Sequence, residues 1–312
     1  MKNGRKILIF GGAGFIGSWL VDTLKSKHKV AVFDIQKKFS NYDTERSKAV
    51  FSFRNNHLLK GARIYKGDAR NLEKVRSVIE KEKPDIIVGL ASIPIENYHD
   101  PILQFEIEVL SMRNILEANK DLKAKVVFIS SLFAVGPFDH VLTEEASLEP
   151  ITNYGIGKAT GELLVKNFAE KYSIVRTTSV YGFGDLNFRA HQIALESALI
   201  GNKFWINKAA LLDFIYVGDL VEGIKRVMFY DHNDIFNISG GKAVTLFEFV
   251  RALECNLNKK LDYEVKSLQD RTKRGTLAND KARFILDWEP KYDLIGGTKE
   301  MINLYKKHMP KI

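Results

Sequence analysis

The stretch Lys6–Gly17, KILIFGGAGFIG, decides the fold of this 312-residue chain. Its first five residues, Lys6–Phe10, have the composition of a buried strand and run directly into a glycine-rich turn. That turn opens a helical pattern, Phe15–Lys25. A strand, a glycine-rich turn and a helix in this order begin a βαβ unit that binds a dinucleotide. We therefore expect an α/β fold built on a doubly wound parallel sheet.

Three glycines of the turn have different structural roles. Gly11 permits the tight turn, Gly14 lets a pyrophosphate approach the backbone, and Gly17 lets the helix pack closely on the strand. The amide groups at the start of the helix, around Phe15 and Ile16, have no partner within the helix and would bind the phosphates. The motif thus predicts a Rossmann fold with a dinucleotide at the amino end of this helix.

Asp34 stands at the end of the second predicted strand, Val30–Phe33, seventeen residues beyond Gly17. A carboxylate here accepts hydrogen bonds from the adenosine ribose hydroxyls and disfavours a 2′-phosphate. We therefore expect NAD over NADP, although Lys37 and Lys38 follow closely and could meet a phosphate. Further cofactor contacts are expected where the next two strands end, at Asp68, Ala69, Leu90 and Ala91.

Strand and helix patterns alternate through the first 180 residues, as in a parallel sheet buried on both faces. The other predicted strands are Arg63–Lys66, Asp85–Val88, Val126–Ser130 and Tyr172–Thr177. The other predicted helices are Leu72–Glu82, Pro101–Asn119, Tyr154–Lys171 and, further on, Ala190–Ile200. The insertion Phe39–Gly61 could form a helix or a substrate-facing flap. We expect an NAD-binding domain of residues 1–176, to which 213–238 return, and a smaller C-terminal substrate-binding lobe of residues 177–212 and 239–312.

Composition excludes several classes of protein. The single cysteine, Cys255, cannot form an intramolecular disulfide or a Cys-rich zinc site, and we expect no metal. No apolar run approaches the roughly 20 residues that a membrane helix needs, so we expect a cytoplasmic protein without a membrane partner. The net charge of +9 is spread along the chain among acidic residues. It favours a mixed solvated surface over phosphate-bearing small molecules, and these over nucleic acid.

Tyr154 and Lys158 lie four residues apart on one face of a predicted helix. Ser131 follows a predicted strand, which brings a hydroxyl to the same edge of the sheet. A neighbouring ammonium lowers the pKa of a phenol, which is ordinarily about 10, and lets a tyrosine act as a base. The alternative is an ordinary amphipathic helix with a packed tyrosine, and without the glycine motif it would be preferred.

The chain resembles the extended short-chain dehydrogenase/reductase family, and within it the nucleotide-sugar epimerase/dehydratase branch. The resemblance covers nearly the whole length; its motifs include GGAGFIG (11–17), SSLFAVG (130–136), NYGIGK (153–158), DFIYVGDLVEGI (213–224) and LANDKARFILDWEPK (277–291). It implies that Tyr154 is the catalytic acid and base and that Ser131 orients the sugar hydroxyl. It also implies that Lys158 binds the nicotinamide ribose and lowers the pKa of the tyrosine.

The same resemblance implies a nucleotide-diphosphate sugar as substrate. Ser179 lies in a loop that touches the sugar and the nicotinamide in the family, and Arg271 is the candidate for the diphosphate. Leu212 stands where many relatives carry an arginine for the nucleotide, and Arg189, Lys203 or Lys208 could replace it. Helices 101–119 and 154–171 pair across a two-fold axis in the family, which implies a homodimer; the apolar positions could instead serve only the protein's own core.

Departures from the family narrow the reaction. Leu132 and Phe133 stand where dehydratases have an acid and a base, so dehydration is disfavoured. Glu108 stands where the family usually has asparagine, and Ser179 replaces a common substrate-binding asparagine. We expect C4 epimerisation through a transient keto-sugar; an NAD(P)-dependent reductase or dehydrogenase is the alternative, and a non-catalytic dinucleotide-sensing module a third.

Overall fold

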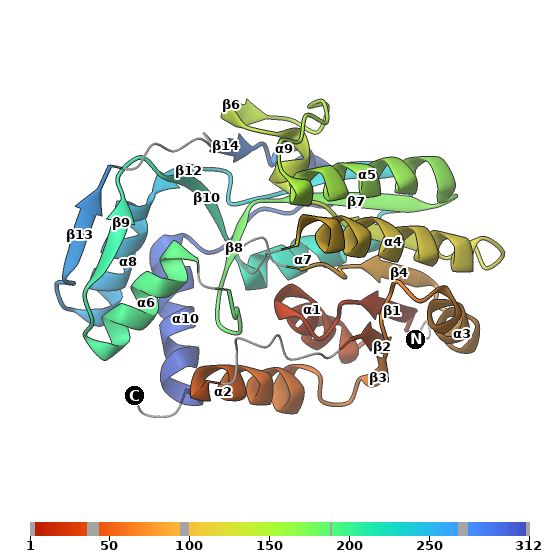
Figure 1. The fold of residues 1–312 in the computed structure, drawn as a ribbon, viewed down its shortest axis with the longest axis horizontal. Coiled ribbons are helices and arrows are strands. Elements are labelled where there is room, and N and C mark those ends of the chain that lie inside the picture. Colours follow the sequence, from red (N-terminus) through yellow and green to blue (C-terminus); the bar gives the residue numbers. More distant parts are fainter. Residues whose placement is uncertain (1–3, 36–43, 94–99, 188, 268–273, 310–312) are drawn as a thin grey trace.

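A seven-stranded parallel sheet forms the centre of the protein, in the order β11-β7-β5-β4-β1-β2-β3 (Figure 1). The computed structural model describes residues 4–35, 44–93, 100–187, 189–267 and 274–309. The chain starts in the middle of the sheet at β1, adds β2 and β3 on one side, and then crosses to β4 on the other. This winding is that of a Rossmann fold, so the expected fold class is confirmed.

The elements of the large sheet fall close to their expected bounds. Its strands are β1 (Lys6–Phe10), β2 (Lys29–Asp34), β3 (Arg63–Lys66), β4 (Ile86–Gly89), β5 (Lys125–Ile129), β7 (Tyr172–Thr177) and β11 (Asp234–Ile238). The helices beside it are α1 (Phe15–Lys25), α3 (Leu72–Glu82), α4 (Pro101–Asn119), α5 (Asn153–Phe168) and α7 (Val217–Met228). Strand β5 ends at Ile129, so Ser130 and Ser131 follow the strand and do not end it.

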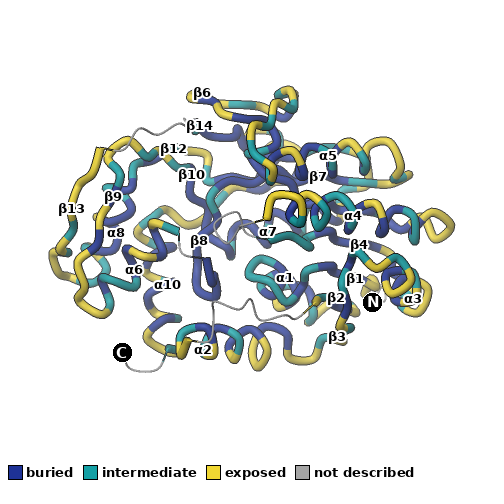
Figure 2. The backbone as a smooth tube through the Cα atoms, in the orientation of Figure 1, coloured by how far each residue is buried: buried dark blue, intermediate teal, exposed yellow. Residues whose placement is uncertain are grey.

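Alternate residues of β1 enter two different cores. Ile7 and Ile9 pack into a cluster that includes residues of α1 and α7, whereas Leu8 and Phe10 pack into a second cluster with residues of α3, α4 and α5. Each such side chain contributes about 1.5–3 kcal/mol by leaving water. Both faces of the sheet are therefore covered at β1, and Figure 2 shows the inner strands buried, whereas the edge strand β3 is mostly exposed.

The remaining elements are short sheets and helices. One sheet contains β8 (Ser179–Tyr181), β10 (Leu211–Tyr216) and β12 (Ala243–Thr245). Two further sheets are strand pairs: β9 (Phe204–Asn207) with β13 (Tyr263–Lys266), and β6 (Phe138–Leu142) with β14 (Arg274–Leu277). The helices are α6 (Ala190–Ile200), α8 (Leu246–Leu257), α9 (Asp280–Leu286) and α10 (Leu294–His308). In the segment 213–238, β10 belongs to the first of these sheets, α7 packs on α1, and β11 pairs with β7. The division of the chain into two lobes stays a prediction.

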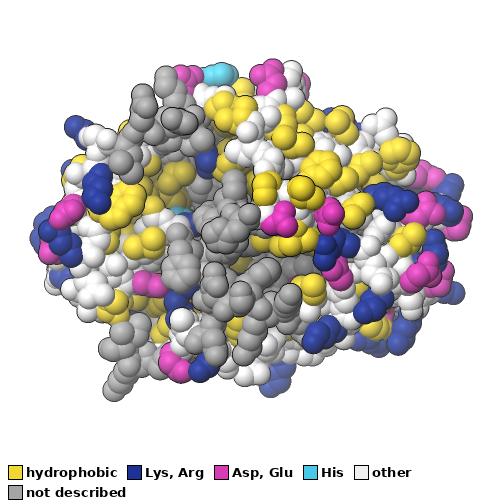
Figure 3. Space-filling model, in the orientation of Figure 1, with side chains coloured by type: hydrophobic (Ala, Val, Ile, Leu, Met, Phe, Trp, Pro, Cys, Tyr) yellow, Lys and Arg dark blue, Asp and Glu magenta, His cyan; other side chains and the backbone are white. Residues whose placement is uncertain are grey.

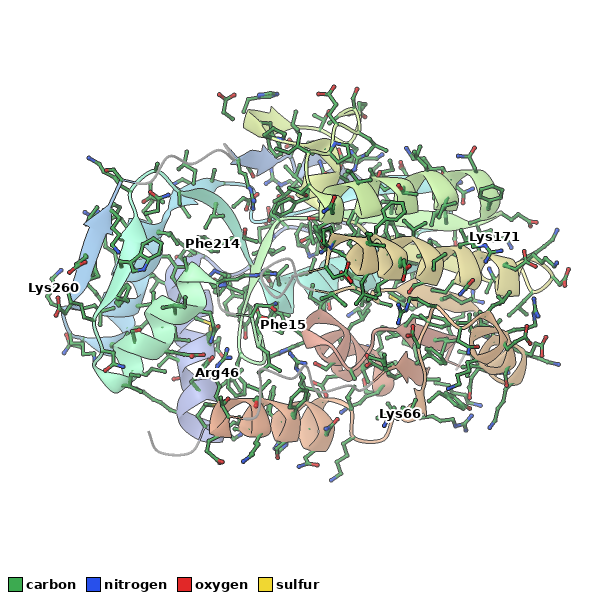
Figure 4. The ribbon with its side chains drawn as sticks, viewed as in Figure 1. Phe15, Arg46, Lys66, Lys171, Phe214 and Lys260 are labelled. Atoms are coloured by element: carbon green, nitrogen blue, oxygen red, sulfur yellow. The ribbon has the colours of Figure 1, made fainter. Side chains whose placement is uncertain are left out.

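The insertion between the second and third strands contains a helix, α2 (Glu45–Phe53), and a π-helical turn, η1 (Arg54–Leu58). Residues 39–43 of the insertion lie outside the described residues. Thr44 caps α2 in a reciprocal pair of hydrogen bonds with Ser47. Arg46 of α2, labelled in Figure 4, donates to the carbonyl of Asp185 at 2.8 Å and forms an ion pair with Glu196 of α6. The insertion, which joins β2 to β3, thus also contacts α6 and the segment before it.

Candidate active site

At two positions of the glycine-rich turn, Gly11 and Gly17, a side chain would collide with the backbone. Gly11 has a φ of +78°, and a Cβ on it would lie 2.7 Å from backbone atoms of Leu90 and Ala91. A Cβ on Gly17 would lie 2.4 Å from the carbonyl oxygen of Gly11. The expected cofactor residues Leu90 and Ala91, which follow β4, therefore lie directly against the turn that follows β1.

Gly14 is the residue before α1 and differs from these two. A Cβ there would meet only the carbonyl of Gly11, at 3.1 Å, among the described residues. The first turn of α1, which includes Phe15 and Ile16, contains no acidic residue, and no described side chain caps it. Figure 4 labels Phe15 near the centre of the molecule. An open backbone at a helix amino terminus fits the pyrophosphate of a dinucleotide.

Asp34 lies at the end of β2 and contacts the same turn. Its Oδ2 accepts a hydrogen bond of 2.9 Å from the amide of Ala13. Arg54 of the insertion approaches from the other side, donating to the carbonyl of Ala13 at 3.3 Å and to that of Gly184 at 3.0 Å. Burial lowers the pKa of Arg54 to about 10, with Asp185 and Asp34 opposing that effect. Arg54 could not be predicted as part of the site, because nothing in the sequence connects the insertion to the turn.

The other two expected cofactor residues follow β3. Asp68 forms an ion pair with Arg70 at 2.7 Å, and the hydrogen bond from Arg70 holds the pKa of Asp68 below its usual value. The carbonyl of Ala69 accepts a hydrogen bond of 3.0 Å from the side chain of Asn114 on α4. These residues, the glycine turn and Asp34 share the carboxyl edge of the sheet, where this fold binds its ligands. The residues present thus fit NAD, which when bound would exchange a hydride with the substrate.

Ser131, Tyr154 and Lys158 come together next to this edge. Thr152 caps the amino end of α5, which places Tyr154 and Lys158 one helical turn apart. The Nζ of Lys158 lies 5.4 Å from the centroid of the Tyr154 ring and donates to the carbonyl of Ile129, the last residue of β5, at 3.1 Å. Ser131 begins the turn after β5, where its hydroxyl accepts a hydrogen bond of 3.3 Å from the amide of Phe133, and it is close enough to Tyr154 to favour the ionised form of that residue. The structure therefore brings the predicted catalytic set together.

The groups around Tyr154 shift its pKa in opposite directions. Burial raises the pKa of Tyr154, and the carboxylate of Glu108 adds to the increase, whereas Lys158, Arg189 and the Ser131 hydroxyl oppose it. Burial also opposes the charged form of Lys158, but Glu108 and Tyr154 together hold the pKa of Lys158 above its usual value. Glu108 acts on both groups, so the residue that departs from the family pattern lies at the centre of the site.

Phe133 forms one wall beside the tyrosine. Its ring meets that of Tyr154 edge to face at 5.5 Å, and the guanidinium of Arg274 lies 4.0 Å from the centroid of the Phe133 ring. Leu132 is buried beside it in a short 3-10 turn, η3 (Leu132–Val135). This wall therefore offers aromatic, aliphatic and cationic groups, and neither Leu132 nor Phe133 can transfer a proton.

The structure describes some, but not all, of the residues expected to bind the substrate. Ser179 opens β8, which pairs with β10, and Arg189 precedes α6 and donates to the carbonyl of Val180 at 3.4 Å. Arg189 is close enough to favour the ionised form of Tyr154, so it belongs to the same side of the site. Arg271, like Lys37 and Lys38, lies outside the described residues.

Taken together, a parallel sheet with a glycine-rich turn after β1 and a Ser–Tyr–Lys set beside its carboxyl edge defines a short-chain dehydrogenase-type enzyme. The model of the NAD dependent epimerase/dehydratase family matches residues 7–239, and the chain belongs to this family. The expectation of an NAD-dependent enzyme of the extended short-chain dehydrogenase/reductase type is thereby confirmed.

Relatives of this chain have more than one activity. It is 26% identical, over 97% of its length and 99% of the relative, to a putative UDP-glucose 4-epimerase of Methanocaldococcus jannaschii. It is also 26% identical, over 96% of its length and 97% of the relative, to the dTDP-4-dehydro-6-deoxyglucose reductase of Escherichia coli. The solved UDP-glucose 4-epimerase of Thermotoga maritima, with UDP-glucose, matches at a TM-score of 0.83 and 25% identity, covering 97% of this chain and 99% of that one.

Two further observations bear on partners. Among the residues that the structure describes, no helix has the length and apolar character needed to cross a membrane. Within the same residues, no group of three or more His, Cys, Asp or Glu side chains is placed to hold a metal ion.

Proposed function

We propose that the protein is an NAD-dependent nucleotide-sugar epimerase that inverts C4 of the sugar through a transient keto-sugar. The observation that carries the proposal is the Ser131–Tyr154–Lys158 set beside the glycine-rich turn. Proton transfer at a sugar hydroxyl needs these groups and no other acid or base. The similarity to 4-epimerases over nearly the whole chain supports the same reaction.

The protein's own residues would hold and move the proton. The Tyr154 oxygen accepts the proton of the C4 hydroxyl in the oxidation half and donates a proton to the carbonyl oxygen in the reduction half. The Ser131 hydroxyl holds the same sugar oxygen through a hydrogen bond. The ammonium of Lys158 favours the tyrosinate, which burial of Tyr154 otherwise disfavours. Between the two halves, the keto-sugar must present its other face.

Leu132 and Phe133 support a reaction without elimination. Dehydration of a sugar requires an additional proton donor and acceptor near C5 and C6. Leu132 is 4% exposed, and the Phe133 ring packs between Tyr154 and Arg274. Since both side chains are hydrocarbons, this part of the site can shape the sugar pocket but cannot remove water.

A reductase of a keto-nucleotide sugar is the second candidate. It uses the same three residues for a single reduction, and the reductase relative is as similar to this chain as the epimerase relative is. The two functions differ in what happens to the cofactor. An epimerase returns it to its starting state in every cycle, whereas a reductase must exchange it.

The test begins with protein purified without added cofactor, whose released nucleotides are identified by mass spectrometry. UDP-glucose, UDP-glucuronate and dTDP-linked sugars are then supplied in turn and followed by NMR, with Tyr154→Phe as the inactive control. Retained NAD and interconversion of C4 epimers would support the epimerase. Stoichiometric consumption of NADH with a keto-sugar would instead identify the reductase. A folded protein that binds neither NAD nor NADP would contradict both.

We further propose a homodimer that works in the cytoplasm. Large apolar side chains are exposed on α4 and α5, among them Ile102 at 72%, Leu163 at 51% and Phe168 at 70%. Figure 3 shows hydrophobic side chains gathered over these helices. Because α4 and α5 pack against each other, they form one continuous surface that a second copy of the chain could cover.

A further inference from the structure

Glu108 of α4 and Lys158 of α5 form an ion pair inside the protein. The carboxylate Oε2 lies 3.0 Å from Nζ, and the two side chains are 1% and 4% exposed. Moving two charges out of water is costly, and apolar residues of the same volume often stabilise a protein as well. A buried pair next to Tyr154 therefore points to a role beyond stability.

The packing of the two helices is built around this carboxylate. Gly157 faces it, and a Cβ on Gly157 would lie 2.7 Å from the Cβ of Glu108. Helix α5 can approach α4 this closely only because residue 157 has no side chain. The other carboxylate oxygen, Oε1, accepts a hydrogen bond from the hydroxyl of Ser92, which follows β4. Both oxygens of Glu108 are thus held, one by Ser92 and one by Lys158.

Lys158 is held in turn by two acceptors of different kinds. Its ammonium has three N–H donors. One donates to the carbonyl of Ile129 at 3.1 Å, and the ammonium as a whole pairs electrostatically with Glu108. Among the described residues this is the one hydrogen bond of the ammonium, so donors remain for a hydroxyl of a bound ribose. The ion pair is therefore compatible with the cofactor role of Lys158, and it fixes the ammonium in place before any ligand arrives.

We propose that Glu108 is a positioning residue that anchors the Lys158 ammonium and sets the pH range in which Tyr154 exchanges its proton. The inference rests on the proposed function, because it concerns the acid–base step of that site. It assigns a task to the carboxylate that replaces the asparagine usual in the family.

The direction of the effect follows from the charges around the tyrosine. In the described part of the chain, Lys158, Glu108 and Arg189 are the charged groups that act on Tyr154, and the Ser131 hydroxyl adds a smaller effect that favours the ionised form. A negative neighbour favours the protonated form of any titrating group. Replacing Glu108 with a neutral residue therefore lowers the pKa of Tyr154 and that of Lys158. The acidic limb and the alkaline limb of the pH–rate profile should therefore both move to lower pH. Removing a charge this close to a titrating group shifts its pKa by about one unit.

The closing experiment compares Glu108→Gln, which keeps the shape, with Glu108→Asp, which keeps the charge. Tyrosinate formation is followed by ultraviolet absorbance as the pH rises, and the contribution of Tyr154 is the difference between each protein and its Tyr154→Phe counterpart. We expect Glu108→Gln to ionise about one pH unit below the wild type and Glu108→Asp to titrate close to it. Glu117→Gln, which removes an exposed charge from the same helix, should leave the titration unchanged.

Equal titrations for Glu108→Gln and the wild type, or equal shifts for the Gln and Asp variants, would overturn the proposal. If Glu108→Gln does not fold, NMR of the wild-type lysine ammonium groups decides instead. A protected signal that is missing in Lys158→Met would support the anchored ammonium, and absence of such a signal would overturn it. Neither measurement needs a substrate, so a failure here is distinguishable from failure of the proposed epimerase activity.

Discussion

Arg176 and Glu162 form a bidentate ion pair with almost no exposed surface, in contact with the turn that carries Ser131. Nε and Nη2 of Arg176 donate to the two carboxylate oxygens of Glu162 at 2.9 and 2.8 Å. Oε1 of Glu162 also accepts a hydrogen bond of 2.6 Å from Ser130, the neighbour of Ser131. The pair thus connects β7, α5 and the turn after β5, and it fixes the position from which Ser131 reaches Tyr154.

Glu162→Gln should therefore destabilise the protein strongly, because it leaves the Arg176 charge buried without a counter-ion. We expect a loss of about 3–5 kcal/mol in the free energy of unfolding, measured by urea denaturation. Glu222→Gln is the matched control: Glu222 pairs with Lys225 on the surface, and its loss should cost less than about 1 kcal/mol. Similar losses of stability for the two variants would show that burial does not make the Arg176–Glu162 pair more costly to break.

Gly17→Ala and Gly14→Ala should separate folding from cofactor binding. A Cβ on Gly17 meets the backbone of Gly11 at 2.4 Å, so the helix must move and the protein should lose about 1–3 kcal/mol or more of stability. A Cβ on Gly14 finds only one carbonyl, at 3.1 Å, and the protein should stay folded. It should nevertheless bind NADH at least tenfold more weakly, since the methyl group occupies the space of the pyrophosphate. Thermal melts measure the stability of both variants, and NADH fluorescence titrations measure their cofactor affinity. A wild-type NADH affinity in Gly14→Ala would contradict the predicted pyrophosphate site.

Sequence patterns predicted the large sheet well because each of its elements carries a local signal. Strand β1 reads as a continuous apolar run, and α1 begins at a glycine turn whose spacing the backbone geometry requires. The contacts of the site depend instead on residues far apart in the chain. Arg54 reaches Gly184 across 130 positions, and Glu108 reaches Lys158 from another helix. Glu108 could be singled out only as a departure from the family, and its partner became visible only once the two helices were packed.

Asp34→Asn should weaken NAD binding and relax the choice between NAD and NADP. The amide oxygen can still accept the hydrogen bond from Ala13, so the turn should keep its shape. Loss of the charge weakens the hydrogen bonds expected from the ribose by about 1 kcal/mol, or five- to tenfold in Kd, and removes the repulsion of a 2′-phosphate. NADH and NADPH fluorescence titrations measure both effects. Asp22→Asn, on the surface of α1 beside Lys25, serves as the control, and an unchanged preference in Asp34→Asn would exclude Asp34 from the ribose site.

Tyr154→Phe should abolish turnover while leaving NADH binding largely intact. The substitution removes only the hydroxyl that would move the proton, and such groups contribute about 10²- to 10⁴-fold to the rate. The ring keeps its contact with Phe133, so the fold should not change. Conversion of the accepted nucleotide sugar is followed by NMR, with Tyr172→Phe at the start of β7 as the control. If Tyr154→Phe kept more than about a tenth of the wild-type rate, another group would have to be the base.

Leu163→Asp should convert the proposed homodimer into monomers. Leu163 is half exposed on α5, and a charge in the centre of an apolar interface would be buried without a partner. Sedimentation at several protein concentrations measures the change in mass. Phe284→Asp makes an equally drastic change at a site on α9 that is 82% exposed and lies outside α4 and α5, so it should leave the dimer intact. A wild type that sediments as a monomer at all concentrations, or a dimer broken only by Phe284→Asp, would remove α4 and α5 as the interface. Their exposed apolar side chains would then have to be explained by a different partner.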